Sequence, residues 1–222
     1  MFSSCADSPF EPLKRMAAVL LIVALSAPGL AAQAAGSCES GGRDDALALV
    51  RDSTNQLLAA AKSYDGVLSE NPARAGELID EFITPHVDLK GFSKLVLGKY
   101  WRRATPEQQD QFLTHFHALV LRSYATALTS NADIPIEYLP MRDEARENFA
   151  TVRSVISATD GSRVNVNYRL YCRRDAWKLF DVTIAGISMV ATVRSALMAE
   201  IKKSGLDGLI KTLEEKSKAV DA

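Results

Sequence analysis

The chain has 222 residues, of which 47% are hydrophobic and 24% are charged, and its formal net charge at pH 7 is -1. This composition is typical of a globular protein rather than of a disordered or fibrous chain. The near-neutral charge argues against a nucleic-acid-binding protein, because that class normally carries a basic excess.

The N-terminus predicts an export signal. Lys14 and Arg15 precede an apolar run from Met16 to Ala27, and Ala32-Gln33-Ala34 fits a small-residue cleavage site. The run is about a dozen residues long, whereas a helix needs about 20 to span a bilayer. The expected parts of the chain are therefore a cleaved signal peptide (1–34), a disordered segment (35–43), a single domain (44–217) and a C-terminal tail (218–222).

Cleavage after Ala34 leaves two cysteines, Cys38 and Cys172. In an oxidising compartment they can form one disulfide that ties the N-terminal segment to a strand. The alternative is a core residue at Cys172 and a free thiol at Cys38. The sequence leaves both possibilities open.

Three helices are expected in the first part of the domain. The first opens at Asp44 or Asp45 and ends near Gly66, the second begins at Asn71-Pro72, and the third runs from about Asp88 to Leu97. Each carries apolar residues at helical spacing, so each has one face to bury.

A longer helix follows, and its start is well marked. Thr105 is a good N-cap, Pro106 suits the first helical position, and Gln108 can complete a capping box with Thr105. Between Phe112 and Leu128 the apolar residues recur at helical spacing and form one stripe. That stripe needs a surface to cover.

After Asn131 the period changes from helical spacing to alternation, which predicts an antiparallel sheet of about four strands. A short strand closes at Pro140, a second starts at Phe149, and a hairpin turn at Asp160-Gly161 leads to the third. The third strand alternates, with one face apolar and the other polar, so one face should be buried and the other solvated.

The last expected strand, Trp177 to Ala185, does not alternate cleanly, which predicts a central strand covered on both faces. Ser188 can then cap a helix that Gly205 ends, and Leu206 to Leu213 forms a final one. The expected fold is α+β: N-terminal helices, a curved antiparallel sheet and closing C-terminal helices around an apolar cavity.

Catalytic patterns are scarce. His115 and His117 stand two apart on a helix and point to different sides, so they cannot share a metal as i, i+4 pairs do. No glycine-rich phosphate loop or nucleophile elbow occurs. Asp181 is the one acid inside the last strand. It could serve as a general base, but we favour a structural carboxylate held by an arginine or by backbone donors.

One stretch resembles a known family. The run Leu97-Gly98-Lys99-Tyr100-Trp101-Arg102-Arg103-Ala104-Thr105, together with Trp177-Lys178-Leu179-x-Asp181-Val182, Gly186-Ile187-Ser188 and Gly205-Leu206-Asp207-Gly208-Leu209-Ile210, is similar to the MlaC family of periplasmic phospholipid carriers, also called the toluene-tolerance auxiliary family. The similarity extends over roughly residues 45 to 216 in family order.

The resemblance implies a monomeric periplasmic carrier without catalytic activity or cofactor, which holds a phospholipid as cargo with its head group towards solvent. It also implies two partners, an inner-membrane ABC transporter with a lipid-binding ring protein and an outer-membrane lipoprotein complex. The alternative is a small periplasmic enzyme that uses Asp181 as its base. From the resemblance and the apolar faces, we expect the lipid-binding residues to be Leu119, Val120, Tyr124, Tyr168, Leu170, Val182, Ile187, Met189 and Val190.

Overall fold

The computed structural model describes Cys38, Leu68 and residues 42–64, 72–130, 135–142, 148–157, 161–174 and 176–218. The expected signal peptide, residues 219–222 of the tail and Asp160 of the predicted hairpin turn lie outside these described residues. Within them, no helix combines the length and the apolar character that a bilayer span requires.

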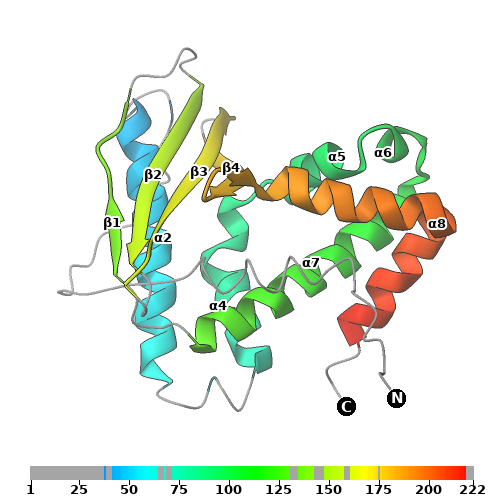
Figure 1. The fold of residues 1–222 in the computed structure, drawn as a ribbon, viewed down its shortest axis with the longest axis horizontal. Helices are drawn as coiled ribbons and strands as arrows, with labels where there is room; N and C mark the ends of the chain where they lie inside the picture. The colour runs from blue at the N-terminus through cyan, green and yellow to red at the C-terminus, as the bar shows by residue number, and fades with distance from the viewer. Residues whose placement is uncertain are drawn as a thin grey trace.

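The described strands form one antiparallel meander, in which strands that follow each other in the chain are also neighbours in the sheet (Figure 1). The expected α+β class is confirmed, with five strands rather than about four. The strands are β1 (Ile136–Tyr138), β2 (Phe149–Ser157), β3 (Arg163–Arg173), β4 (Ala176–Ile184) and β5 (Ile187–Ser188). The fifth strand has only two residues, too few for an alternating pattern to reveal.

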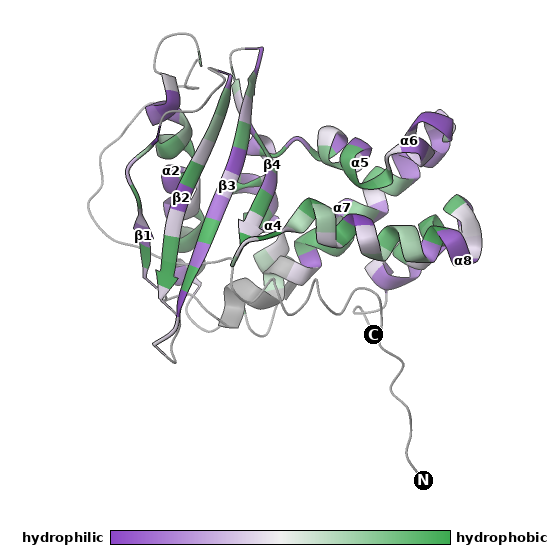
Figure 2. Cartoon of the chain, turned by 45° about the horizontal axis from the view of Figure 1, so that its top comes forward, coloured by the Kyte–Doolittle hydropathy of each residue, from purple (hydrophilic) through white to green (hydrophobic). Residues whose placement is uncertain are grey.

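β3 has one buried and one exposed face, as its alternation predicts, whereas the outer residues of β2 are half-buried or buried. Val152 on β2 pairs with Tyr168 on β3, and both side chains are buried against the helices. On the opposite face Arg153 pairs with Asn167. Apolar and polar segments alternate along both strands (Figure 2). We call the buried side the inner face and the other the outer face.

A β-bulge explains the irregular pattern of β4. The register with β3 shifts after Arg169, which pairs with Asp181, whereas Leu170 pairs with Leu179, so Phe180 is the extra residue. The bulge brings Leu179 and Val182 to the same, inner face. No residue of β4 is fully exposed, in agreement with a central strand covered on both faces, but the irregular pattern comes from the bulge, which leaves Phe180 on the outer face.

The helices pack on the inner face and beside the sheet (Figure 1). Their bounds are α2 (Gly42–Ser63), α4 (Pro72–Phe82), the 3-10 helix η1 (Thr84–His86), α5 (Leu89–Leu97), α6 (Lys99–Arg103), α7 (Pro106–Ser130) and α8 (Met189–Lys218). The predicted capping box at the start of α7 is confirmed, since Gln108 N donates to Thr105 Oγ1 at 3.2 Å and Thr105 N donates to Gln108 Oε1 at 3.0 Å.

The C-terminal helix α8 is kinked where the sequence predicts a break. Gly205 has φ 75° and ψ −177°, a conformation that is almost confined to glycine. The helix runs on to Lys218, past the predicted end at Leu213. The apolar positions stop at Leu213, but the Lys218–Glu214 ion pair, at 2.6 Å, joins residues one turn apart and continues the helix.

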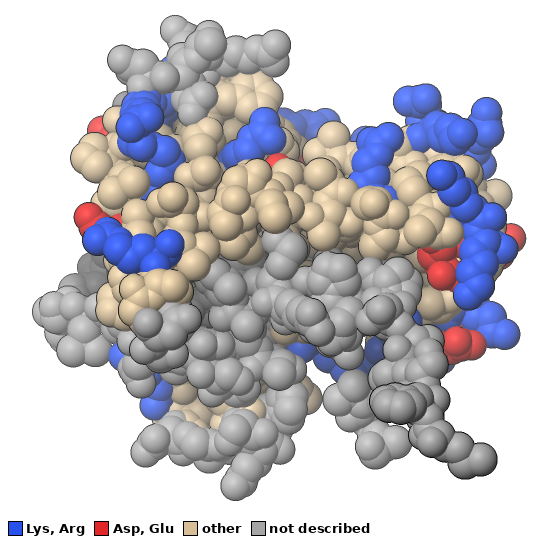
Figure 3. Space-filling model, viewed as in Figure 1, with Lys and Arg blue, Asp and Glu red and all other residues tan. Residues whose placement is uncertain are grey.

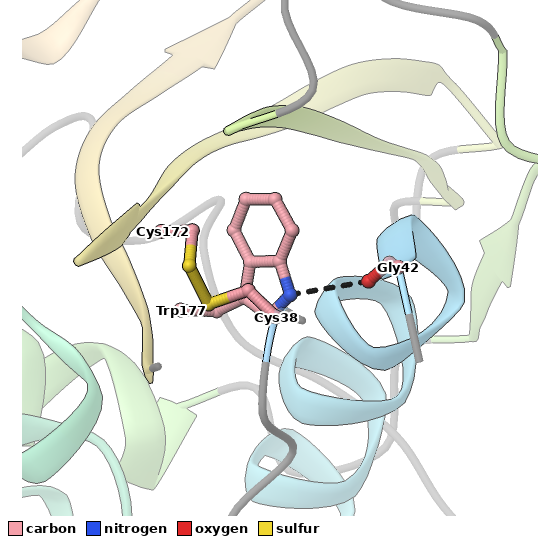
Figure 4. Close-up of a disulfide and its surroundings, with 4 residues drawn as sticks. All are labelled: Cys38, Gly42, Cys172 and Trp177. Carbon is pink, nitrogen blue, oxygen red and sulfur yellow. Dashed lines mark hydrogen bonds between the residues drawn. A yellow bond between two sulfur atoms is a disulfide. The ribbon is translucent and has the colours of Figure 1, made fainter. Parts of the chain in front are cut away.

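A disulfide between Cys38 and Cys172 resolves the question that the sequence leaves open. The Cα atoms lie 6.0 Å apart across a sequence separation of 134 residues. Trp177, which pairs with Cys172 in the sheet, lies beside the bridge and donates its indole N–H to the carbonyl of Gly42 at 3.2 Å (Figure 4). The bridge and this hydrogen bond attach the start of α2 to the inner face of β3 and β4.

Candidate functional site

A cavity of about 180 Å³ lies between the inner face of the sheet and the surrounding helices. Its lining combines β3 and β4 with residues from nearly every described helix. The lining residues are Thr54, Leu57, Ile79, Ile83, Thr84, Val87, Leu89, Phe92, Phe116, His117, Val120, Leu121, Tyr168, Leu179, Phe180, Asp181, Val182, Met189 and Val193. The majority are aliphatic or aromatic, so the cavity suits an apolar ligand.

Polar groups in this lining already have partners. His117 Nε2 lies 3.2 Å from Asp80 Oδ1 and 3.3 Å from Thr84 Oγ1. Thr54 donates its hydroxyl to the carbonyl of Val50 at 2.7 Å. Because these groups bond to the protein itself, they do not impose a particular polar ligand on the cavity.

Four of the nine expected lipid-binding residues line this cavity: Val120 on α7, Tyr168 on β3, Val182 on β4 and Met189 at the start of α8. They lie far apart in the sequence, and the packing of α7 and α8 around the sheet brings them together. The inner-face position of Val182 depends on the bulge at Phe180.

The other five expected residues lie elsewhere. Leu119 and Leu170 belong to the hydrophobic core, with side chains that are 8% and 1% exposed. Val190 is half-buried at the start of α8, and Ile187 on β5 is 56% exposed. Tyr124 lies on α7, but its side chain is outside the described part of the chain.

Several lining residues were not on the expected list because they belong to the N-terminal helices. Leu57 on α2, Ile79 on α4 and Phe92 on α5 occupy the apolar stripes of those helices. The stripes indicate burial, and nothing in helical spacing distinguishes a stripe that packs against a core from one that faces a cavity. The stacked rings of Phe92 and Phe116, with centroids 5.6 Å apart, close one side of the cavity.

Asp181 has the surroundings of a structural carboxylate. Its side chain is 2% exposed, and Oδ1 accepts a hydrogen bond from the backbone N–H of Val190 at 3.0 Å. Oδ2 accepts from the Ser188 hydroxyl at 2.8 Å and lies 3.3 Å from Arg169 Nη1. These are the arginine and backbone partners that the structural interpretation predicts. Both oxygens are held in place at the N-terminus of α8, where a negative charge is favourable.

Among the described residues, no cluster of three or more His, Cys, Asp or Glu side chains is arranged to hold a metal ion. The lining of this site is mainly apolar, and its one buried acid is engaged in joining β4 to α8.

Comparison with known proteins gives a consistent result. Residues 51–215 match the family described as MlaC protein. The chain is 24% identical over 170 residues to the intermembrane phospholipid transport system binding protein MlaC of Haemophilus influenzae, covering 75% of this chain and 79% of that protein. It is 28% identical over 169 residues to the toluene tolerance protein ttg2D of Pseudomonas putida, covering 75% and 77%.

A solved structure extends the similarity to the fold. The phospholipid-binding protein from Ralstonia solanacearum, determined in complex with a phospholipid, is 30% identical and has a TM-score of 0.72. The match covers 80% of this chain and 99% of that one. Family, relatives and structure agree, and this chain belongs to the MlaC family.

Proposed function

We propose that this protein is a phospholipid carrier that encloses acyl chains in the cavity between α7 and the inner face of the sheet. The observation that carries the proposal is the cavity lining, where aliphatic and aromatic side chains predominate and the polar groups are bonded to the protein. Membership of the MlaC family and the structural similarity to a phospholipid-bound protein support it.

The physical chemistry of lipids requires such an enclosure. Removing a methylene from water contributes about 0.8 kcal/mol, so an acyl chain of roughly 16 carbons left in water would cost on the order of 12 kcal/mol. A carrier must therefore cover the chain almost completely. It must also release the chain to a membrane. An apolar lining without polar groups that bind the ligand strongly resembles the bilayer interior, so it allows both uptake and release.

The cavity must widen when it takes up a lipid. Its volume of about 180 Å³ is below the ~300–1,000 Å³ of ordinary small-molecule sites. The lining comes from separate layers, so a movement of α4 and α7 away from β3 and β4 would enlarge it. We therefore expect lipid loading to change the packing of these helices while the sheet keeps its pairing.

We expect a monomer that works in the periplasm after removal of residues 1–34. It would exchange lipid with an inner-membrane ABC transporter carrying a lipid-binding ring protein and with an outer-membrane lipoprotein complex. Asp181 would support the fold rather than catalyse a reaction, because its oxygens are bonded to Val190, Ser188 and Arg169.

Mass spectrometry of organic extracts tests the carrier proposal. Protein purified without detergent should release phospholipid in near-stoichiometric amount. An extract without phospholipid, from folded protein that also fails to take up lipid from vesicles, would contradict it. Turnover of an added ester that is abolished in Asp181→Asn would support the enzyme alternative instead.

A further inference from the structure

A second hollow, of about 950 Å³, lies between α5 and the outer face of the sheet. Its floor is aromatic: the rings of Phe149, Tyr171 and Phe180 lie 5.7 to 6.5 Å apart from centroid to centroid. We call this hollow the outer groove. It opens on the opposite side of the sheet from α2.

The rim of the outer groove is strongly basic. It carries five cationic side chains and one acidic one, in a chain whose net charge is -1. The cations are Lys90 and Lys94 of α5, and Arg173, Arg174 and Lys178 at the ends of β3 and β4. Lys and Arg side chains gather over α5 and over the strand ends in the surface view, with few acidic side chains between them (Figure 3).

The single acid of the rim is already engaged. Asp88 caps α5 by accepting a hydrogen bond from Gly91 N at 2.9 Å, and it also accepts one from the hydroxyl of Tyr171. Burial and the bond to Asp88 raise the pKa of Tyr171, so its hydroxyl stays protonated and donates. Asp88 therefore contributes one negative charge beside five positive ones, and the rim keeps an excess of positive charge.

Among the residues that the structure describes, the cations of the rim are not neutralised by acidic partners, although Arg173 bonds to Tyr171. Within the described part of the chain, none of the five forms an ion pair within 4.0 Å, although Lys178 Nζ donates to the carbonyl of Pro85 at 2.5 Å. Lys90 and Lys94 stand one turn apart on α5 and are both exposed. Both line the outer groove, together with Arg173 and Arg174.

The outer groove adjoins the cavity. Val87 and Phe180 line both, and the backbone N–H of Asp88 donates to the carbonyl of Leu179 at 3.0 Å along the wall between them. The wall is thin, because it consists of the bulged part of β4 and the segment that leads into α5. Only this wall separates the two hollows, so a lipid that occupied both would displace the contact between Asp88 and Leu179.

We propose that the outer groove binds the phosphate head group of an anionic phospholipid whose acyl chains occupy the cavity. The proposal rests on the carrier function proposed above. Lysine and arginine are the ordinary ligands of a phosphate, and their hydrogen bonds to it are charge-assisted. The aromatic floor would cover the glycerol part of the molecule.

Head-group selectivity follows from the same charges. Phosphatidylethanolamine would bring its ammonium among five cations, whereas phosphatidylglycerol would bring none. Like charges at close range disfavour binding. The outer groove should therefore favour phosphatidylglycerol over phosphatidylethanolamine.

A loading experiment tests this. Delipidated protein is incubated with vesicles of phosphatidylglycerol and phosphatidylethanolamine in equal parts, repurified, and its lipid is quantified by mass spectrometry. Wild-type protein should be enriched in phosphatidylglycerol. Lys90→Gln with Lys94→Gln should lower the ratio of bound phosphatidylglycerol to bound phosphatidylethanolamine roughly threefold to tenfold, as expected for the loss of two exposed charges.

The matched control is Lys202→Gln with Lys203→Gln, two exposed lysines of α8 outside the groove lining, which should leave the ratio at its wild-type value. If wild-type protein and the variant Lys90→Gln with Lys94→Gln (the groove variant) bind the two lipids in the same ratio, the head-group assignment is overturned. Near-stoichiometric total lipid in the same samples would still support the carrier function. Failure of wild-type protein to load any lipid would instead overturn the carrier function.

A sedimentation experiment separates bound cargo from membrane lipid as the source of the phosphate. Wild-type and groove variant are sedimented with phosphatidylglycerol vesicles. If the variant loses vesicle binding while its bound lipid ratio stays at the wild-type value, the cations contact the bilayer and the cargo assignment is wrong. If wild-type protein and the groove variant sediment equally with the vesicles while the variant has a lowered ratio of bound lipids, the cargo assignment is supported.

Discussion

The carboxylate of Asp181 in β4 accepts a hydrogen bond from the backbone N–H of Val190, 3.0 Å away in the first turn of α8. This bond joins the sheet to the helix that closes the fold. The same carboxylate accepts a hydrogen bond from the hydroxyl of Ser188. The Ser188 hydroxyl oxygen in turn accepts a hydrogen bond from the backbone N–H of Ala191 at 3.2 Å. A double cap therefore fixes the start of α8 beside the cavity, to which Met189 contributes.

Replacing Asp181 with asparagine should destabilise the fold without abolishing lipid binding. The amide oxygen can still accept from Val190, but the charge that favours the helix N-terminus and Arg169 is lost, which should lower the free energy of unfolding by about 1–3 kcal/mol. Urea denaturation measures the change. Asp110→Asn, on the exposed surface of α7, is the control and should be nearly neutral. Complete loss of bound lipid in a folded Asp181→Asn protein would contradict a purely structural role.

Removing the disulfide should be costly because it closes a long segment. The bridge joins residues 134 positions apart and so restricts the unfolded chain strongly. Cys38→Ser with Cys172→Ser removes that restriction and should lower the free energy of unfolding by about 2–5 kcal/mol. Urea denaturation of the double variant, compared with wild-type protein with and without reductant, measures it. Equal stability of all three would show that the bridge contributes nothing.

His86 should make the protein less stable as the pH falls. Burial lowers the pKa of His86 below its usual 6.5, and Lys178 lowers it further. Below about pH 6.5 the unfolded chain therefore takes up a proton that the folded chain does not, so the free energy of unfolding falls with pH.

The corresponding variant is His86→Gln, which should reduce the loss of stability between about pH 7 and pH 5. Urea denaturation at a series of pH values measures the slope. His115→Gln on α7 controls for the removal of an imidazole elsewhere. An unchanged slope in His86→Gln would show that this side chain does not carry the effect.

The kink of α8 should depend on glycine at position 205. An added Cβ would meet no atom within 4 Å, so the whole cost of Gly205→Ala is that of its backbone conformation, about 1–3 kcal/mol. Gly76→Ala in α4 is the matched control, because the nearest atom to its Cβ would be 4.0 Å away and it should stabilise the helix by about 0.5–1 kcal/mol. Thermal melts compare them, and an unaffected Gly205→Ala protein would contradict the assignment of strain.

Local chemistry made some elements of this fold predictable. The capping box of Thr105 and Gln108 depends on residues three apart, and the two faces of β3 depend on alternation alone. Both are present in the structure. The bulge at Phe180 is different, because it is defined by the register between two strands, and β4 by itself gives no sign of which residue is extra.

The candidate site was less predictable than the fold. Val120 and Val182 could be proposed as lining residues from their apolar faces, but Leu119 and Leu170, with equally apolar surroundings in the sequence, lie in the core. Whether a buried side chain meets another side chain or a cavity is decided by how whole layers pack. The outer groove shows the same limit, since α5 and the ends of β3 and β4 are brought together only by the fold.

The central claim is that acyl chains lie between α7 and the inner face of the sheet, and filling that space tests it most directly. Val120→Trp with Val182→Trp introduces two indoles into the cavity, and Val182→Phe is a milder variant should the first fail to fold. Asn165→Trp, exposed on the outer face of β3, is the control.

Lipid per protein, measured by mass spectrometry after loading from vesicles, is the deciding quantity, with circular dichroism confirming the fold. We predict that the cavity variants lose the greater part of their lipid while Asn165→Trp retains the wild-type amount. Wild-type lipid content in a folded cavity variant would contradict the account.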